Sequence, residues 1–130
     1  MGQSNLELVK AAYAAFLRGD VEAWPEYFDP EVVWHIPGRS AMAGTLEGRA
    51  NVLAALSDVA ALIANGTVRL EVHDVLASDD HVVGLISEHA ERDGKHFDDN
   101  FAQVIHMKDG KVIESWNMYT DIYARDEFWA

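Results

Sequence analysis

FDDNFAQVIHMKDGKVIESWNMYTD, residues Phe97–Asp121, contains two alternating polar and apolar runs on either side of Asp109-Gly110. An Asp-Gly pair between two such runs favours the primed two-residue turn, whose twist matches that of the flanking strands. The sequence therefore predicts a long β-hairpin. Since successive side chains of a strand point to opposite faces, one face is expected to carry Phe97, Asp99, Phe101, Gln103, Ile105, Met107, Val112, Glu114, Trp116 and Met118.

Before the hairpin, the chain has two segments with helical periodicity and one strand pattern. Ser4 and Glu7 have the capping-box spacing of a helix start, and the apolar stripe that follows ends at Gly19. A second and longer stripe ends at Asn65-Gly66. The expected elements are a helix from Ser4 to Gly19, a short helix from Trp24 to Phe28, a strand from Glu31 to Ile36, a loop from Arg39 to Gly48 and a helix from Arg49 to Asn65.

Four strands joined by short turns are expected after the long helix. Their predicted bounds are Val68–Leu76, Val82–Glu91, Phe97–Met107 and Val112–Thr120. Helices and one strand followed by an antiparallel meander give an α+β order, not the alternating order of a parallel sheet. The chain has 130 residues and no repeat or linker, so a single domain over residues 1–130 is expected.

Composition limits the partners and the compartment. The net charge is −12 at pH 7, from 10 Lys and Arg against 22 Asp and Glu, so phosphate backbones and anionic lipid surfaces are repelled. We therefore expect no nucleic-acid partner and no membrane partner, and the apolar runs are too short to cross a bilayer. The absence of Cys excludes disulfides and is compatible with the cytoplasm, where we expect the protein.

Several short patterns occur in an order that resembles the nuclear transport factor 2-like superfamily, in particular its SnoaL-like and ketosteroid-isomerase-like members. They are the first helix running into Arg18-Gly19-Asp20, the segment FDPEVVW from Phe28 to Trp34, the Gly44 to Gly48 loop, and Asp109-Gly110-Lys111-Val112 before Trp116. The resemblance covers essentially the whole chain. It implies a cone, in which a strongly curved antiparallel sheet wraps around the long helix, with two further N-terminal helices and an apolar pocket. Members are commonly homodimers, so a homodimer is expected.

The catalytic residues of two branches of this superfamily are not reproduced. The general base of ketosteroid isomerases, an Asp before a Pro at the end of the first strand, corresponds to Ile36. Their oxyanion tyrosine would fall at Ala12, one residue before Tyr13. Limonene-epoxide-hydrolase-like members have an Asp two residues after a Trp on the last strand, and that position is Met118. The same cone hosts several reactions, so the fold alone does not identify one.

Two carboxylates on the apolar hairpin face are the first candidates for chemistry. With a two-residue turn at Asp93-Gly94, Glu88 falls opposite Asp99. Carboxylates side by side against an apolar wall do not both ionise readily, so the pair is predicted to share a proton and to act as acid and base. The other interpretation places both at the hydrated rim of the cone. The same counting across the next turn predicts the pairs Gln103–Trp116 and Ile105–Glu114.

The remaining candidates are one histidine and a set of aromatic and polar side chains. His35 follows Trp34 with the opposite orientation, but twist before Pro37 could turn it inward to serve as a general base. The alternative is a surface or interface histidine. No His pair has the i, i+4 spacing of a helical zinc site, so no metal and no cofactor is expected. The expected ligand-binding residues are Tyr13, Trp34, Gln103, Glu114, Trp116 and Met118.

Two functions remain open on the sequence. In the first, a small, largely apolar organic ligand binds in the cone and undergoes acid–base chemistry of the isomerase, cyclase, dehydratase or hydrolase type at Glu88, Asp99 or His35. In the second, the chain is a non-catalytic dimeric binding or interaction module. Phe128 and Trp129 are expected to cover the pocket mouth or to pack on a partner subunit. The dimer interface in the second function is the convex sheet face with Val83, Leu85, Val104 and Ile113.

Overall fold

The structure, a computed structural model, describes residues 4–130; residues 1–3 of the predicted domain lie outside the described part. In chain order the elements are α1 Asn5–Leu17, the 3₁₀ helix η1 Trp24–Tyr27, β1 Phe28–Ile36, β2 Gly44–Glu47, α2 Arg49–Ala64, β3 Val68–Ala77, β4 His81–Arg92, β5 Lys95–Lys108, β6 Lys111–Tyr119 and α3 Ile122–Phe128. The α+β class is confirmed. No helix in residues 4–130 is long and apolar enough to cross a membrane.

The predicted start of α1 is confirmed by its cap. Ser4 lies just before the helix, and its hydroxyl oxygen accepts a hydrogen bond from the backbone N–H of Glu7 at 3.2 Å. This bond satisfies one of the donors that every helix start leaves free. The helix buries Val9 and Ala15 and ends shortly before Gly19, whose φ of 73° suits glycine.

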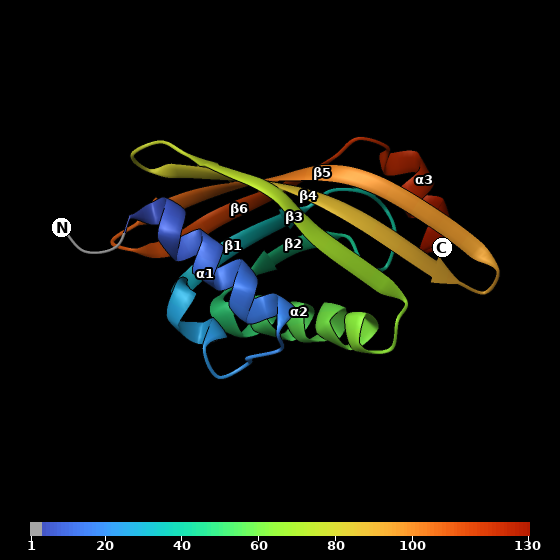
Figure 1. The fold of residues 1–130 in the computed structure, drawn as a ribbon, viewed down its shortest axis with the longest axis horizontal. Coiled ribbons are helices and arrows are strands. Elements are labelled where there is room, and N and C mark those ends of the chain that lie inside the picture. Colours follow the sequence, from blue (N-terminus) through green and yellow to red (C-terminus); the bar gives the residue numbers. More distant parts are fainter. Residues whose placement is uncertain (1–3) are drawn as a thin grey trace.

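A single curved sheet holds all six strands in the order β2-β1-β6-β5-β4-β3. Strands β3 to β6 form the predicted meander, while β1 runs parallel to β6. Register shifts interrupt the β1–β6, β3–β4 and β5–β6 pairs. Such irregularities increase the local twist and bend the bulged strand. The curvature gives the sheet a concave face and an outer, convex face (Figure 1).

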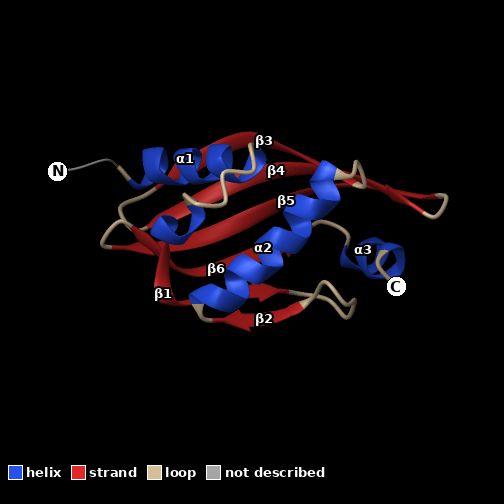
Figure 2. Ribbon diagram, turned by 90° about the horizontal axis from the view of Figure 1, so that it is seen from below, coloured by secondary structure: helices blue, strands red, loops and turns tan. Residues whose placement is uncertain are grey.

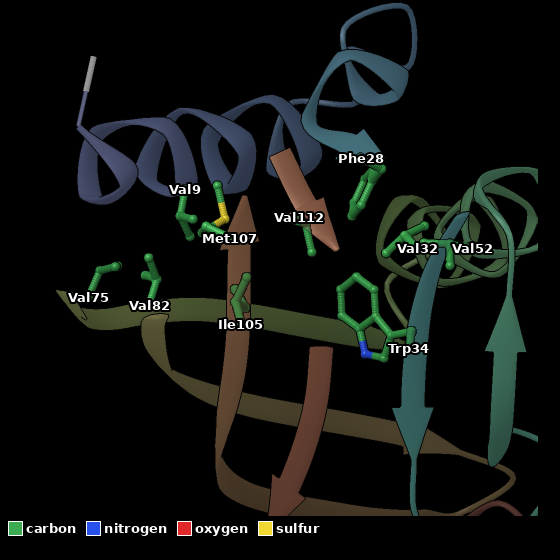
Figure 3. Packing of buried hydrophobic residues seen from close by; sticks show 10 residues of the cluster. All are labelled: Val9, Phe28, Val32, Trp34, Val52, Val75, Val82, Ile105, Met107 and Val112. Carbon is green, nitrogen blue, oxygen red and sulfur yellow. The ribbon is translucent and has the colours of Figure 1, made fainter. Parts of the chain in front are cut away.

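Helices α1 and α2 lie over the concave face, and α3 lies beside one end of it (Figure 2). The main core forms between these layers, where Val9 of α1 and Val52 of α2 are buried together with side chains of the sheet (Figure 3). On β1, Val32 and Trp34 point inward, as the alternation predicts. The cone-shaped architecture is thereby confirmed, with α2 as the long helix that the sheet surrounds.

Both predicted tight turns have the expected geometry. The φ values are 52° and 75° in Asp109-Gly110, and 51° and 78° in Asp93-Gly94. Positive φ at both central residues defines the type I′ turn, which aligns the strands directly opposite each other. In the β4–β5 hairpin, Glu88 therefore pairs with Asp99, as predicted.

The predicted β5–β6 register is wrong beyond the first residues of β6. Met107 pairs with Val112, but His106 pairs with Glu114, so Ile113 has no partner and forms a bulge. One extra residue moves every later side chain of β6 to the other face. Glu114, Trp116 and Met118 therefore lie on the outer face, not on the cavity face. The observed pairs are Gln103–Asn117 and Ile105–Ser115, in place of the predicted Gln103–Trp116 and Ile105–Glu114.

Two elements were missed by the sequence patterns. Strand β2 lies in the predicted loop and is only four residues long, so its conformation depends on pairing with β1. Helix α3 begins after Asp121, whose carboxylate accepts a hydrogen bond from the N–H of Ala124. Phe128 and Trp129 are 3% and 9% exposed at the end of this helix. They therefore pack within the monomer and help to close the cone.

The bulge makes a prediction that compares two positions on β6. Ser115 is fully buried, so Ser115→Asp places an unpaired charge in the interior and should lower the free energy of unfolding by about 3 kcal/mol or more. Met118→Lys, at a side chain that is 52% exposed, should change it by less than about 0.5 kcal/mol. Urea denaturation of both variants measures the difference. A larger loss of stability in Met118→Lys than in Ser115→Asp would show that β6 has no bulge at Ile113.

Candidate functional site

A cavity of about 170 Å³ lies between the concave face of the sheet and helices α1, α2 and α3. Its walls are mostly aliphatic and aromatic, with Phe16 and Trp24 on the helical side and Phe101 and Ile105 on the sheet. Small-molecule sites have this composition, with a few placed polar groups. Among the described lining residues, only Glu88 and Arg125 carry a charge. The uncharged polar lining residues are Tyr13, Tyr27, Gln103, Ser115, Asn117 and Tyr119.

Glu88 of β4 and Arg125 of α3 form a buried ion pair at the α3 end of the cavity. The Nη2 of Arg125 donates to Oε1 of Glu88, and each side chain is 8% exposed. The guanidinium also lies 3.7 Å from the centre of the Tyr119 ring. Burial lowers the pKa of Arg125 to about 10, against the opposing effect of Asp126. Arg125 therefore stays charged at neutral pH and keeps Glu88 paired.

Asp99 lies behind this pair and does not line the cavity. It is 7% exposed, its Oδ1 accepts a hydrogen bond from the Thr120 hydroxyl, and its Oδ2 is buried without a partner among the described residues. Glu88 and Asp99 are cross-strand neighbours, but only Glu88 reaches the cavity. Of the two carboxylates predicted to share a proton, Glu88 therefore lines the cavity and Asp99 lies behind it.

Tyr13 reaches the sheet from α1. Its hydroxyl donates to Oε1 of Gln103 at 2.8 Å, which ties α1 to β5 across the cavity. Burial raises the pKa of Tyr13, so the phenol remains protonated. The space for this ring depends on Gly84, because a Cβ there would collide with the Tyr13 hydroxyl.

A second set of hydrogen bonds joins polar side chains of β1 and β6. Trp34 Nε1 donates to Oδ1 of Asn117 at 3.0 Å, and Nδ2 of Asn117 donates to the Tyr119 hydroxyl at 3.0 Å. Burial raises the pKa of Tyr119 to about 12, although the bond from Asn117 acts in the opposite direction. The Tyr119 phenol is therefore neutral at physiological pH. Beside this chain, the Ser115 hydroxyl is buried with no partner in the described chain.

Comparison with known proteins identifies the family. A family model described as the SnoaL-like domain matches residues 9–115. The chain belongs to the SnoaL-like family. A solved structure of a nuclear transport factor 2-like protein from Burkholderia xenovorans, with 23% identity and a TM-score of 0.80, shares the fold.

Relatives of this SnoaL-like chain cover its full length. The uncharacterized protein Rv0034 of Mycobacterium tuberculosis is 36% identical over 128 residues, which are 98% of this chain and 97% of that protein. The solved structure of Bal32a, from a soil-derived mobile gene cassette, has 39% identity and a TM-score of 0.88 over 97% of this chain and 96% of that one. TerC, co-crystallized with polyporic acid, has 26% identity and a TM-score of 0.78 over 95% of both chains.

The structure separates the predicted site residues of this SnoaL-like chain into two groups. Glu88, Tyr13, Trp34 and Gln103 line the cavity, and Asp99 is buried behind it. The second group, His35, Glu114, Trp116 and Met118, lies on the outer face. The catalytic and ligand-binding roles themselves remain predictions.

The inward orientation considered for His35 is wrong, because β1 keeps its alternation up to Ile36. His35 Nε2 lies 2.6 Å from Oε2 of Glu114, and its ring stacks on Trp116 at 5.6 Å between centroids. These contacts hold the imidazole on the outer face. No three His, Cys, Asp or Glu side chains within residues 4–130 are grouped to hold a metal ion.

Sequence reasoning missed four polar cavity residues, which lie on β6 and α3. Ser115, Asn117 and Tyr119 were assigned to the outer face, because no sequence signal showed the bulge at Ile113. Arg125 lies in the C-terminal segment, in which only the aromatic residues Phe128 and Trp129 are predicted to have a role. Arg125 is the single cation between Asp121 and Ala130, but it stands directly before Asp126 and Glu127, so the local sequence carries no signal that it is buried. The isomerase base position, Ile36, does line the cavity but has no proton to exchange.

The buried ion pair predicts a large effect of a single substitution. Arg125→Met leaves Glu88 buried without its partner and should lower the free energy of unfolding by about 3–5 kcal/mol. The double variant Arg125→Met, Glu88→Met should recover most of this loss, since no unpaired charge remains. Denaturant unfolding measures both.

Arg69→Met is the matched control for this pair. Arg69 and its partner Glu71 are 71% and 63% exposed, so the loss should be less than about 1 kcal/mol. Equal losses for Arg69→Met and Arg125→Met would contradict the buried pair.

Proposed function

We propose that this SnoaL-like protein binds a small, largely apolar ring compound in the cone cavity and catalyses proton transfer on it through Glu88. The observation that supports this most directly is the pairing of Glu88 with Arg125 as the charged residues of an otherwise apolar cavity wall. Perturbed, buried charges in a cavity are typical of functional sites. A ligand in this cavity would lie against the Glu88 carboxylate and its guanidinium partner.

The cavity volume supports a ligand of one ring with short substituents. A dry apolar cavity of roughly 150 Å³ accommodates benzene, and this cavity measures about 170 Å³. The similarity to TerC, which was co-crystallized with polyporic acid, also favours an organic ligand. The polar side chains on the sheet would orient such a ligand, while the aliphatic walls exclude water.

The proposed chemistry is an isomerisation by proton transfer. Glu88, as a carboxylate, accepts a proton from a carbon of the ligand, and the C–H electron pair moves into the ligand. The carboxylic acid exchanges this proton with solvent and returns a proton to another carbon, so atoms and charge balance without a further reactant. General acid–base catalysis of this kind contributes roughly 10²- to 10⁴-fold.

We also propose that the protein is a homodimer through its outer sheet face. Val83, Leu85 and Val104 lie next to one another on this face and are only half buried. Contiguous apolar surface of this type is usually covered by a partner. This arrangement is compatible with catalysis, because the cavity opens on the other face of the sheet. It also serves the rival function, a non-catalytic dimeric binding module.

Glu88→Gln tests the catalytic proposal. A panel of single-ring compounds is first screened by ligand-observed NMR, and those that bind are incubated with the protein in D₂O. The wild-type protein should exchange ligand C–H hydrogen for deuterium, and Glu88→Gln should bind within about threefold but lose at least about 100-fold in exchange rate. The amide keeps the shape and can still accept a hydrogen bond from Arg125.

Glu91→Gln, on the exposed face of the same strand, is the matched control and should exchange at the wild-type rate. Undiminished exchange in Glu88→Gln would contradict the catalytic role. Binding without exchange in the wild-type protein would favour the non-catalytic module.

The dimer proposal is tested by Val104→Glu. Light scattering coupled to size exclusion should give twice the monomer mass for the wild-type protein and the monomer mass for the variant, because a buried carboxylate at the interface has no partner. Lys10→Glu, at an exposed position of α1, is the control. It changes the net charge of the protein more than Val104→Glu does, and it should leave the mass unchanged. A monomeric wild-type protein would rule the interface out.

A further inference from the structure

A row of outer-face side chains connects the proposed dimer interface to a histidine. Val83 of β4 pairs with Val104 of β5, and Val104 pairs with Trp116 of β6. Trp116 in turn pairs with His35 of β1, and all four side chains are half buried. Neighbouring strands lie roughly 4.8 Å apart, so His35 is within about 10 Å of Val104. A partner chain seated over Val104 therefore also approaches His35.

His35 forms a polar pair at the edge of this apolar row. Its Nε2 lies 2.6 Å from Oε2 of Glu114, and its ring stacks on Trp116 at 5.6 Å between centroids. The side chains of His35 and Glu114 are 33% and 35% exposed, so both still contact water. A partner chain that packs on Trp116 would remove part of this water.

The groups around the pair are acidic or titrate near neutral pH. Glu114 lies opposite His106, and His106 lies opposite His81, whose Nδ1 is 2.8 Å from Oδ1 of Asp80. Besides His35, the titratable groups on this part of the outer face are Glu31 of β1, Glu47 of β2, Glu114 of β6, His106 of β5, and His81 of β4 with Asp80 before it. None of the named groups is a permanent cation. Compensation of the carboxylates therefore depends on protons.

A single proton decides the charge that the interface would bury. When His35 is neutral and Glu114 is ionised, the pair carries a net charge of one negative unit, and removing it from water is costly. One added proton makes the pair neutral overall, whether the histidine or the carboxylate holds it. Burial beneath a partner therefore favours the protonated pair.

We infer that the homodimer forms with uptake of a proton at each His35–Glu114 pair, so that association strengthens as the pH falls. The inference rests on the proposed outer-face homodimer and specifies its regulation. It is carried by the position of the half-buried pair, which stacks on the side chain next to Val104 in the same row.

The direction of the pH dependence follows from proton linkage. A dimer that binds more protons than two free chains is favoured by a higher proton concentration. Its extra stability is fully present where the free chains are protonated as well. It is lost as the pH rises through the range in which the dimer releases these protons. Histidine in water titrates at roughly pH 6.5, so the change should fall between about pH 6 and pH 8.

A second histidine cluster on the same face supplies the control. It lies next to the Asp93-Gly94 turn, where His96 contacts Asp98 at 2.7 Å and Glu91 at 3.2 Å. Hydrogen bonds with Asp98 and, to a smaller extent, Glu91 raise the pKa of His96. The Glu91 side chain is 76% exposed, so a change there alters the net charge without altering the row that leads to Val104.

The experiment measures the dimer dissociation constant of the full chain by sedimentation equilibrium at pH 6, 7 and 8. Each chain carries a net charge of −12, and salt at about 0.5 M screens the general repulsion between two copies. The wild-type dissociation constant should rise at least about tenfold from pH 6 to pH 8. Glu114→Gln should dimerise at least about tenfold more tightly than wild type at pH 8 and should no longer weaken as the pH rises. Glu91→Gln removes the same charge and should keep the wild-type dependence.

A measurement on the wild-type protein keeps the inference testable if Glu114→Gln does not fold. The heat of dimer dissociation at pH 7 is measured in two buffers that differ in ionisation enthalpy. Dissociation should release about one to two protons per dimer, one from each pair at most.

The outcomes distinguish this inference from the homodimer itself. A dissociation constant that is the same at pH 6 and pH 8, no proton release, or the same pH dependence in Glu114→Gln and Glu91→Gln would overturn the role of the pair and leave the homodimer intact. A wild-type protein that is monomeric at all three pH values would contradict the homodimer, and this inference with it.

Discussion

The unpaired residue Ile113 determines what the two faces of the sheet contain. Because it adds one residue to β6, Ser115, Asn117 and Tyr119 turn toward the cavity, while Trp116 and its neighbours turn outward. Without the bulge, the concave face would carry Glu114, Trp116 and Met118 in place of Ser115, Asn117 and Tyr119. The cavity volume and the hydrogen-bond chain both depend on this local irregularity.

The second constraint is the need to compensate buried charge. Arg125 is brought to the cavity by a short C-terminal helix, and a guanidinium in this place requires a carboxylate. Glu88 on β4 supplies this carboxylate. The type I′ turn at Asp93-Gly94 sets the register of the β4–β5 hairpin and so the place of Glu88. The ion pair therefore joins the C-terminal segment to the sheet, and Trp129 completes the wall. The same ion pair therefore helps to close the cone and holds the proposed base, Glu88, at the cavity.

The chain shares its architecture with SnoaL-like relatives. The position of the isomerase base holds Ile36, which makes this part of the wall apolar. The charged groups lie instead on β4 and α3. In a cone, positions on several strands and helices face the same interior. Charged groups that serve this interior are therefore not restricted to one element.

The sequence alone determined α1, η1 and α2, the meander, the tight turns and the Glu88–Asp99 pairing, because these follow from local periodicity and from glycine at positions with positive φ. It also indicated the family. It could not reveal the bulge at Ile113, the parallel pairing of β1 with β6, the short strand β2 or the inward position of Arg125. These depend on contacts between residues far apart in the chain, whose energies local patterns do not contain. Only the tertiary structure therefore decided which polar groups meet in the cavity.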